Sequence, residues 1–211
     1  MDILLVASPK TLLEKYLTII EAAELIPVAA ETEIIATARA LSRSVAAIKN
    51  AALLVSLGAQ TTDLAILRGG VLAFTRSIAA GGEALSRALV SGLDFNANQA
   101  EEFKRTYGLE QDKLQGKIVT AVKPIMDTII GEMKRALAFY SEKHKDERVE
   151  VTLLSGGTAK LPGMVVYIAQ NMGIETQLAN PWVGIKRDPR FAVLDKEGAT
   201  FTVSVGLALR E

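Results

Sequence analysis

The sequence of 211 residues contains no cysteine and one histidine, His144. The absence of cysteine excludes disulfides, thiolate nucleophiles and cysteine-ligated zinc, and a single histidine cannot form a metal site alone. Aromatic residues make up 5% of the chain, while hydrophobic residues reach 49%. This composition supports a buried core in one domain or two small ones, in a reducing compartment such as the cytosol.

Net charge and long apolar runs are also missing. Twenty-four basic residues balance twenty-four acidic ones, so no net field attracts nucleic acid or an anionic membrane. No apolar run approaches the roughly 20 residues that span a bilayer, and no basic signal-peptide region opens the chain. We therefore predict a cytoplasmic protein that binds no nucleic acid and does not insert into a membrane. The abrupt start, Met-Asp before an apolar run, predicts a piece of a longer protein.

The stretch Leu53–Ile78 organises the rest of the chain. It holds three short apolar runs, separated by a small-residue turn and by Gly69-Gly70. Glycine supplies the backbone conformations of tight hairpins, so this pattern predicts a three-stranded antiparallel meander.

The first turn of the meander reads Gly58-Ala59-Gln60-Thr61-Thr62. Small residues let backbone N–H groups and hydroxyls approach an anion, which favours phosphate binding. The Rossmann and P-loop fingerprints run from a strand into a helix, whereas this turn joins two predicted strands. A plain structural turn is the alternative interpretation.

The remaining elements follow from apolar spacing and from breaks at Gly and Pro. We predict strands over 3–7, 26–30, 149–154 and 174–178, and helices over 9–23, 31–41, 82–90, 97–107, 118–145, 162–172 and 200–209. Asn96 and Gln99 predict a capping box, and Gly108 a helix end. From residue 53 onward, leaving aside the helices between 92 and 148, the order is that of a ribonuclease-H-like α/β layer.

The helix over 118–145 carries an amphipathic stripe that includes Met133, with Pro124 marking its first turn or a kink. We interpret this stripe as core. His144 lies between Lys143 and Lys145 in the last turn, where cations suit the helix dipole, and we interpret it as structural.

Two glycine-rich segments, in this order of elements, resemble the actin, heat-shock chaperone and sugar kinase superfamily. Ser56–Asp63 is similar to the superfamily's second phosphate motif except at its first position, and Leu153–Gly163 is similar to its adenosine motif. The resemblance implies phosphate binding by Gly58, Ala59, Gln60, Thr61 and Thr62, and adenosine binding by Gly156, Gly157 and Thr158.

A third segment, Ala100–Arg105, resembles the chaperone helix that lines adenosine, which implies adenosine binding by Glu101, Lys104 and Arg105. Their offsets of three and four residues put the three polar groups on one helix face. Without the glycine motifs, a solvated salt-bridging face is the simpler interpretation.

Within the superfamily, the chain resembles the FtsA family and, more closely, the PilM family of type IV pilus assembly. The similarity rests on Leu67–Ile78, on the Ala-Glu-Glu-Phe-Lys-Arg-Thr-Tyr-Gly run and on Asn180-Pro181-Trp182. It implies an actin-type ATPase lobe over 51–211 with a small helical subdomain inserted at about 92–148. Residues 1–50 are then a remnant of an FtsA-type inserted subdomain and a helix that crosses between lobes.

The resemblance implies a cytoplasmic nucleotide-binding scaffold, peripheral to the inner membrane through its partners. The cofactor is ATP or ADP with Mg²⁺ in a longer parent, bound weakly or not at all by this chain alone. The expected partner is the cytoplasmic tail of an inner-membrane, PilN-like pilus protein, and self-association is a further expectation. An FtsA-like cell-division protein and an ATP-dependent phosphotransferase are the alternatives.

Position 56 departs from the superfamily pattern. The superfamily has an aspartate there for the magnesium shell and the attacking water, and a serine hydroxyl supplies no anionic oxygen. No first phosphate motif is present either. We therefore predict at most weak ATPase activity, name no catalytic residue, and leave the metal ligand at Ser56 open.

Overall fold

The computed structural model describes residues 5–46 and 48–210, and its contacts divide the chain into Met1–Glu33 and Ile34–Glu211. This division places nearly all of α2 (Glu33–Val45) in the larger unit. The boundary predicted at residue 50 is a different one, because it separates segments by the lobe of a two-lobed protein to which they belong. It stays a prediction.

The smaller unit contains α1 (Lys10–Ala22), which confirms the helix predicted over 9–23 with ends one residue shorter. The strand predicted over 26–30 is wrong, because that segment has no regular structure and Ile26 and Val28 are almost fully exposed. A strand requires a hydrogen-bonding neighbour, and none pairs with this run in the described residues. Of the strand predicted over 3–7, the described part is not a strand, and residues 3 and 4 lie outside the described residues.

A five-stranded mixed sheet, in the order β3-β2-β1-β4-β5, forms the centre of the larger unit. Its strands are β1 (Ala51–Leu57), β2 (Thr62–Arg68), β3 (Val71–Ile78), β4 (Val149–Ser155) and β5 (Glu175–Leu178). The first three form the predicted antiparallel meander, and β4 and β5 run parallel to β1. The ribonuclease-H-like α/β fold predicted from the element order is confirmed.

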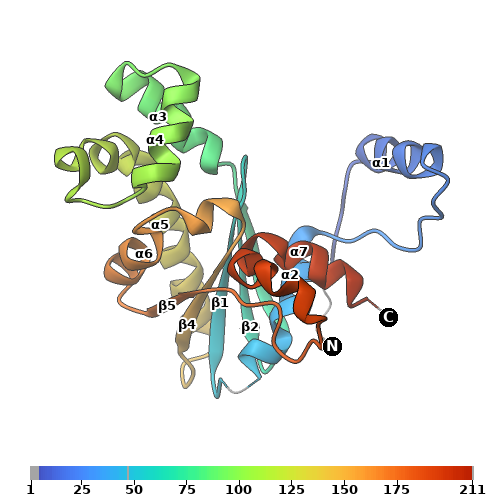
Figure 1. Ribbon diagram of the computed structural model, residues 1–211. Coiled ribbons are helices and arrows are strands. Elements are labelled where there is room, and N and C mark those ends of the chain that lie inside the picture. The colour runs from blue at the N-terminus through green and yellow to red at the C-terminus, as the bar shows by residue number, and fades with distance from the viewer. Residues whose placement is uncertain (1–4, 47, 211) are drawn as a thin grey trace. The chain divides into compact units, whose positions relative to one another are not determined.

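Helices cover both faces of the sheet, which is why β1 is buried along its whole length. Alternate residues of β1 enter two cores: Leu53 and Val55 pack in the core that includes α5 (Lys117–Lys143) and α6 (Met164–Met172), whereas Leu54 packs in the core that includes α2. On the α2 side, α7 (Gly198–Ala208) packs closely against α2 (Figure 1).

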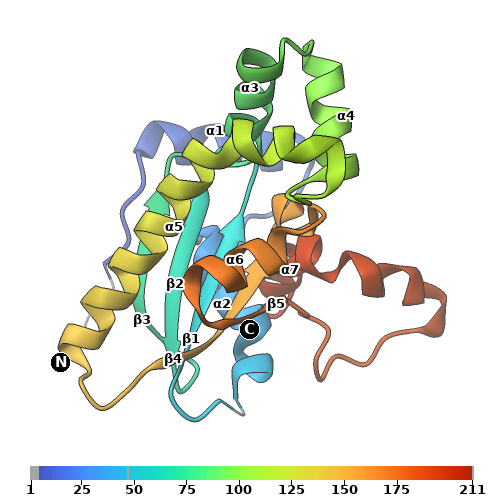
Figure 2. The same cartoon turned by 90° about the vertical axis from the view of Figure 1, so that its left-hand side faces the viewer.

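A small helical group stands at one end of the sheet (Figures 1 and 2). It contains α3 (Gly82–Leu93), α4 (Ala97–Tyr107), the 3-10 turn η1 (Lys113–Gly116) and the start of α5. The group overlaps the insertion predicted at about 92–148 but begins earlier, at α3, and the insertion itself stays a prediction. The capping box of Asn96 and Gln99 and the end of α4 at Gly108 are confirmed. The end of α3 is later than predicted, because the left-handed residue that terminates it is Asp94.

Two further 3-10 segments complete the unit. They are η2 (Gly157–Lys160), directly after β4, and η3 (Pro189–Glu197), directly before α7. No helix in the described residues is long and apolar enough to cross a membrane.

Candidate functional site

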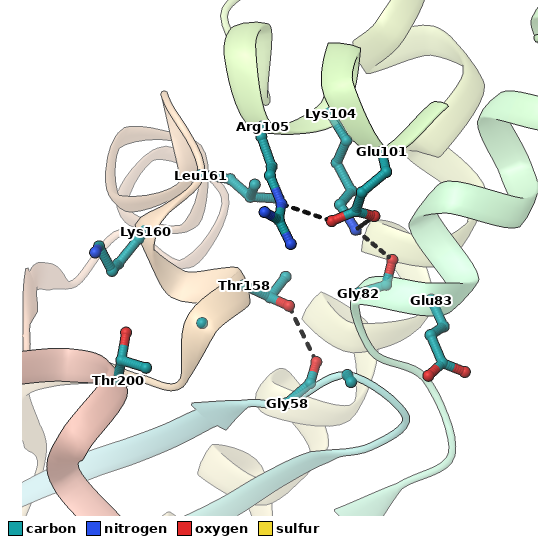
Figure 3. A pocket seen from close by; sticks show the side chains of 12 residues that line it. Gly58, Gly82, Glu83, Glu101, Lys104, Arg105, Thr158, Lys160, Leu161 and Thr200 are labelled. Atoms are coloured by element: carbon teal, nitrogen blue, oxygen red, sulfur yellow. Dashed lines mark hydrogen bonds and ion pairs between the residues drawn. The ribbon is translucent and has the colours of Figure 1, made fainter. Parts of the chain in front are cut away.

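A pocket of about 640 Å³ opens where the hairpin between β1 and β2 meets α3, α4 and η2 (Figure 3). Its walls come from segments far apart in the sequence. They are Gly58, Ala59, Gly82, Glu83, Glu101, Lys104, Arg105, Gly157, Thr158, Lys160, Leu161 and Thr200. The hairpin, the polar face of α4 and the glycine turn, which the sequence singles out separately, therefore share one pocket.

Hydrogen bonds from α3 and from η2 fix the backbone carbonyls of Gly58 and Ala59 in the hairpin. The carbonyl oxygen of Gly58 accepts from the Gly82 N–H at 2.9 Å and from the Thr158 hydroxyl at 3.0 Å, and the Ala59 carbonyl accepts from the Glu83 N–H at 2.8 Å. The C=O and the N–H of one trans peptide unit point in opposite directions. Two carbonyls thus face α3, and the N–H groups of Ala59 and Gln60 point away from it.

Those two N–H groups have no acceptor among residues 5–46 and 48–210. The Gly58 N–H, by contrast, donates to the Thr61 carbonyl across the turn at 2.9 Å. Consecutive unpaired backbone N–H groups in a turn attract anions. The hairpin therefore offers an anion two backbone donors.

The threonine hydroxyls of the hairpin donate elsewhere. The fully buried Thr62 donates to the carbonyl oxygen of Ala80 at 2.7 Å, and Thr61 donates to the Asp63 carboxylate at 3.2 Å. A hydroxyl has one hydrogen to donate. Of the five predicted phosphate-binding residues, Gly58 and Ala59 line the pocket. The other three, Gln60, Thr61 and Thr62, do not.

The polar residues of α4 form one ion cluster on the pocket wall. Glu101 accepts from the Lys104 ammonium at 2.6 Å and from Arg105 Nε at 2.7 Å. Partial burial raises the pKa of the Glu101 carboxyl, but hydrogen bonds from Lys104, Ser86 and Arg105 outweigh this and lower it to about 2. Glu101 is therefore an anion at neutral pH. The Arg105 side chain is largely exposed, and its terminal nitrogens point toward the pocket (Figure 3).

The glycine turn after β4 depends on the absence of a side chain at Gly156. This residue has φ of 88°, and a Cβ there would lie 2.3 Å from the carbonyl oxygen of Leu57. Only glycine fits both conditions. Gly157 and Thr158 are part of the pocket lining, and Gly156 is not.

Several lining residues carry no recognisable sequence signal. Lys160 lies at the pocket edge and forms an ion pair with Glu197, just before α7, at 2.5 Å. Thr200 comes from the first turn of α7. Gly82 is marked in the sequence as a helix start, but its contact with the hairpin depends on tertiary packing that spacing does not reveal.

Ser56 is nearly buried on β1, beside Ser155 of the parallel strand β4. It does not line the pocket, and the hydroxyl oxygen of Ser155 is buried with no hydrogen-bond partner among residues 5–46 and 48–210. Among the described residues, no group of three or more histidines and carboxylates could hold a metal ion. Position 56 therefore contributes a hydroxyl and no carboxylate to this region.

Comparisons with known proteins agree with the fold. A family model described as type IV pilus assembly protein PilM matches residues 1–211. The cell division protein FtsA of Streptococcus pneumoniae serotype 2 (strain D39 / NCTC 7466) is 30% identical over 161 residues, which cover 67% of this chain and 35% of FtsA.

Solved structures show the same similarity. A chain of the PilM-PilN type IV pilus biogenesis complex superposes with a TM-score of 0.80 at 29% identity, covering 94% of this chain and 57% of that one. MreB5 of Spiroplasma citri bound to AMPPNP superposes with a TM-score of 0.63 at 17% identity, over 96% of this chain and 64% of MreB5, and shares the fold. The chain thus spans about a third of the FtsA relative and little more than half of the PilM chain.

Proposed function

Because the chain belongs to the type IV pilus assembly protein PilM family, we propose that it is the second lobe of an actin-like, nucleotide-binding scaffold of pilus assembly. One observation carries this proposal: the hairpin, the charged face of α4 and the Gly157-Thr158 turn line a single pocket. A pocket of about 640 Å³ has the size of small-molecule and cofactor sites in general.

The ligand we propose is ATP or ADP with Mg²⁺. Superfamily members with the same fold bind such nucleotides, as MreB5 does with AMPPNP. The N–H groups of Ala59 and Gln60 suit phosphate oxygens, and the exposed guanidinium of Arg105 and the Gly157-Thr158 turn suit the adenosine end. Bound Mg²⁺ would neutralise part of the phosphate charge, and this chain contributes no carboxylate at Ser56 to position it.

Hydrolysis of ATP by this lobe alone is not part of the proposal. The attacking water must be oriented by an acceptor, and Ser56 is a nearly buried hydroxyl outside the pocket. Nucleotide therefore acts as a ligand that changes the conformation of the scaffold and, with it, the partner surface.

The partner we propose is the cytoplasmic tail of a PilN-like inner-membrane protein, because a PilM relative is solved in complex with PilN. Docking on such a tail would hold the scaffold at the cytoplasmic face of the membrane without insertion. Self-association is a further proposal, which rests on the fold alone.

A direct test measures capture of the purified chain by immobilised peptides that carry a PilN-like cytoplasmic tail, with and without magnesium ATP. We expect capture that changes with nucleotide. Replacing Gly58 by Val brings a side chain against the Thr61 carbonyl, which lies 3.0 Å from a Cβ at this position. Capture of Gly58→Val should therefore not respond to nucleotide, whereas the control Gly131→Val, outside the pocket lining, should behave as the wild type.

Two results would contradict the proposal. A tail that binds neither this chain nor a complete protein with both lobes would remove the proposed partner. Unchanged nucleotide response in Gly58→Val would remove the hairpin from the site.

The 30% identity to FtsA favours a cell-division scaffold as the second candidate. An FtsA-like protein would carry a basic amphipathic membrane-targeting segment. Sedimentation of the complete protein with anionic vesicles, and failure to bind any PilN-like tail, would favour this candidate.

A further inference from the structure

The ammonium group of Lys104 is completely engaged inside the protein, although it borders the pocket. It donates to the Glu101 carboxylate at 2.6 Å, to the Ser86 hydroxyl at 2.8 Å and to the Gly82 carbonyl at 3.1 Å. An ammonium has three N–H donors, so none is left for a ligand. The residue is 7% exposed, which leaves little surface for direct contact.

Gly82, at the other end of this connection, holds the hairpin. Its N–H donates to the Gly58 carbonyl, and its own carbonyl accepts from Lys104 (Figure 3). A Cβ on Gly82 would lie 2.5 Å from the Thr158 hydroxyl, so the three segments meet here with no spare room. Lys104 therefore links α4, at the proposed adenosine end, to the hairpin at the proposed phosphate end.

Ser86 completes the link from one turn further along α3. Its hydroxyl accepts from Lys104 and lies 2.9 Å from the Glu101 carboxylate and 3.2 Å from the Gly82 carbonyl. Ser86 itself is not part of the pocket lining. Any effect of Ser86 on a ligand must consequently act through Lys104, Glu101 or Gly82.

We propose that Lys104 and Ser86 are positioning residues that fix the separation between the two ends of the pocket, and that Lys104 does not contact the nucleotide. This proposal rests on the proposed nucleotide site. Charge supports it, because Glu101 neutralises Lys104 internally, while the more exposed Arg105 is the cation of the cluster that remains accessible.

The two roles differ in which ligands they affect. A lysine that binds the nucleoside would contribute to adenosine and ATP alike. A lysine that sets the spacing matters for ATP, which contacts both ends, and hardly at all for adenosine, which occupies one end. If a residue mattered for stability alone, its replacement would leave the ratio of the adenosine and ATP dissociation constants unchanged.

The experiment measures dissociation constants for adenosine and for magnesium ATP by backbone-amide NMR titration of the full chain. We expect Ser86→Ala to weaken ATP binding about twofold to tenfold, the loss of one hydrogen bond, with little change for adenosine. Lys104→Met should show the same selectivity more strongly. Ser91→Ala, on the exposed side of α3, and Lys123→Met, in an exposed pair with Asp127, are the matched controls.

Equal losses for adenosine and ATP in Lys104→Met, with no effect of Ser86→Ala, would overturn the proposal and make Lys104 a ligand. An unchanged ratio of the two constants in both variants would also overturn it. If the wild-type pocket amides respond to neither ligand, the proposed nucleotide site fails as well, which is a distinguishable result.

Amide hydrogen exchange tests the same link without ligand and covers the case in which Lys104→Met does not fold. In Ser86→Ala, the N–H groups of Gly82 and Glu83, which donate to the hairpin, should exchange faster than in the wild type, while those of β1 should not change. Unchanged exchange at Gly82 and Glu83 would contradict the positioning role.

Discussion

The Thr158 hydroxyl donates a hydrogen bond of 3.0 Å to the carbonyl oxygen of Gly58, although 100 residues separate them. The contact follows from the sheet, since β1 and β4 are parallel neighbours with Ser56 beside Ser155. Segments that leave two adjacent parallel strands at the same end start side by side at one edge of the sheet. The two glycine motifs are therefore parts of one structure, and their coupling can be measured.

The crowding between Gly82 and Thr158 predicts a non-additive double-mutant cycle. Gly82→Ala should destabilise the chain by about 1–3 kcal/mol, because its Cβ would lie 2.5 Å from the Thr158 hydroxyl. Thr158→Ala removes that hydroxyl, so the double variant should be less destabilised than the sum of the single variants, by about 0.5 kcal/mol or more. Urea unfolding measures the cycle, and strict additivity would show that the two positions do not touch.

Two glycine-to-alanine changes should have opposite effects on stability, because Gly206 lies where α7 packs on α2 and Gly131 lies on an open part of α5. In Gly206→Ala the Cβ would lie 1.9 Å from the backbone carbonyl oxygen of Ala36, so we expect destabilisation of about 3 kcal/mol or more. Gly131→Ala, in α5, meets only the flexible end of Arg135 and should stabilise the helix by about 0.5–1 kcal/mol. Thermal or urea unfolding that ranks the variants in the other order would contradict this packing.

Glu101 predicts an acid-dependent contribution to stability. Its pKa in the folded protein, about 2, lies below the ordinary value of 4.5, so its ion cluster stabilises fully above about pH 4.5. That contribution is lost as the pH falls from about 4.5 toward 2. The side chain is partly exposed, so screening limits the effect to about 1 kcal/mol or less.

The measurement compares urea unfolding of the wild type, Glu101→Gln and the control Glu102→Gln at about pH 6 and pH 3. The stability difference between wild type and Glu101→Gln should shrink at the lower pH, and the difference for Glu102→Gln should not follow it. An equal difference at both values would mean that Glu101 is not held as an anion by Lys104 and Arg105.

The sequence predicts the meander and both glycine turns well, because their signals are local. Gly69 and Gly70 have the positive φ that a tight turn requires, and Gly156 likewise permits a conformation closed to other residues. Short apolar runs are less informative. Ile26–Ala30 has strand composition, yet a strand needs a hydrogen-bonding partner, which composition does not supply.

Side-chain roles in the pocket depend on tertiary contacts and were less predictable. The motif places Thr62 in the hairpin, but the pleat of β2 turns its side chain inward to Ala80. Spacing puts Lys104 on the same face as Glu101, but the acceptors Ser86 and Gly82 come from another helix. Their distance in sequence leaves no periodic signal that relates them to α4.

The central claim is that this pocket binds nucleotide, and backbone-amide NMR titration with magnesium ATP tests it most directly. A two-lobed micromolar site would gain about two or three charge-assisted hydrogen bonds from a first lobe. Without those bonds, the pocket of this chain should bind with a dissociation constant of about 0.1 mM or weaker. The account predicts saturable shifts at Ala59, Gln60, Arg105 and Thr158. Saturable shifts confined to other parts of the chain, or no saturable response at all, would contradict it.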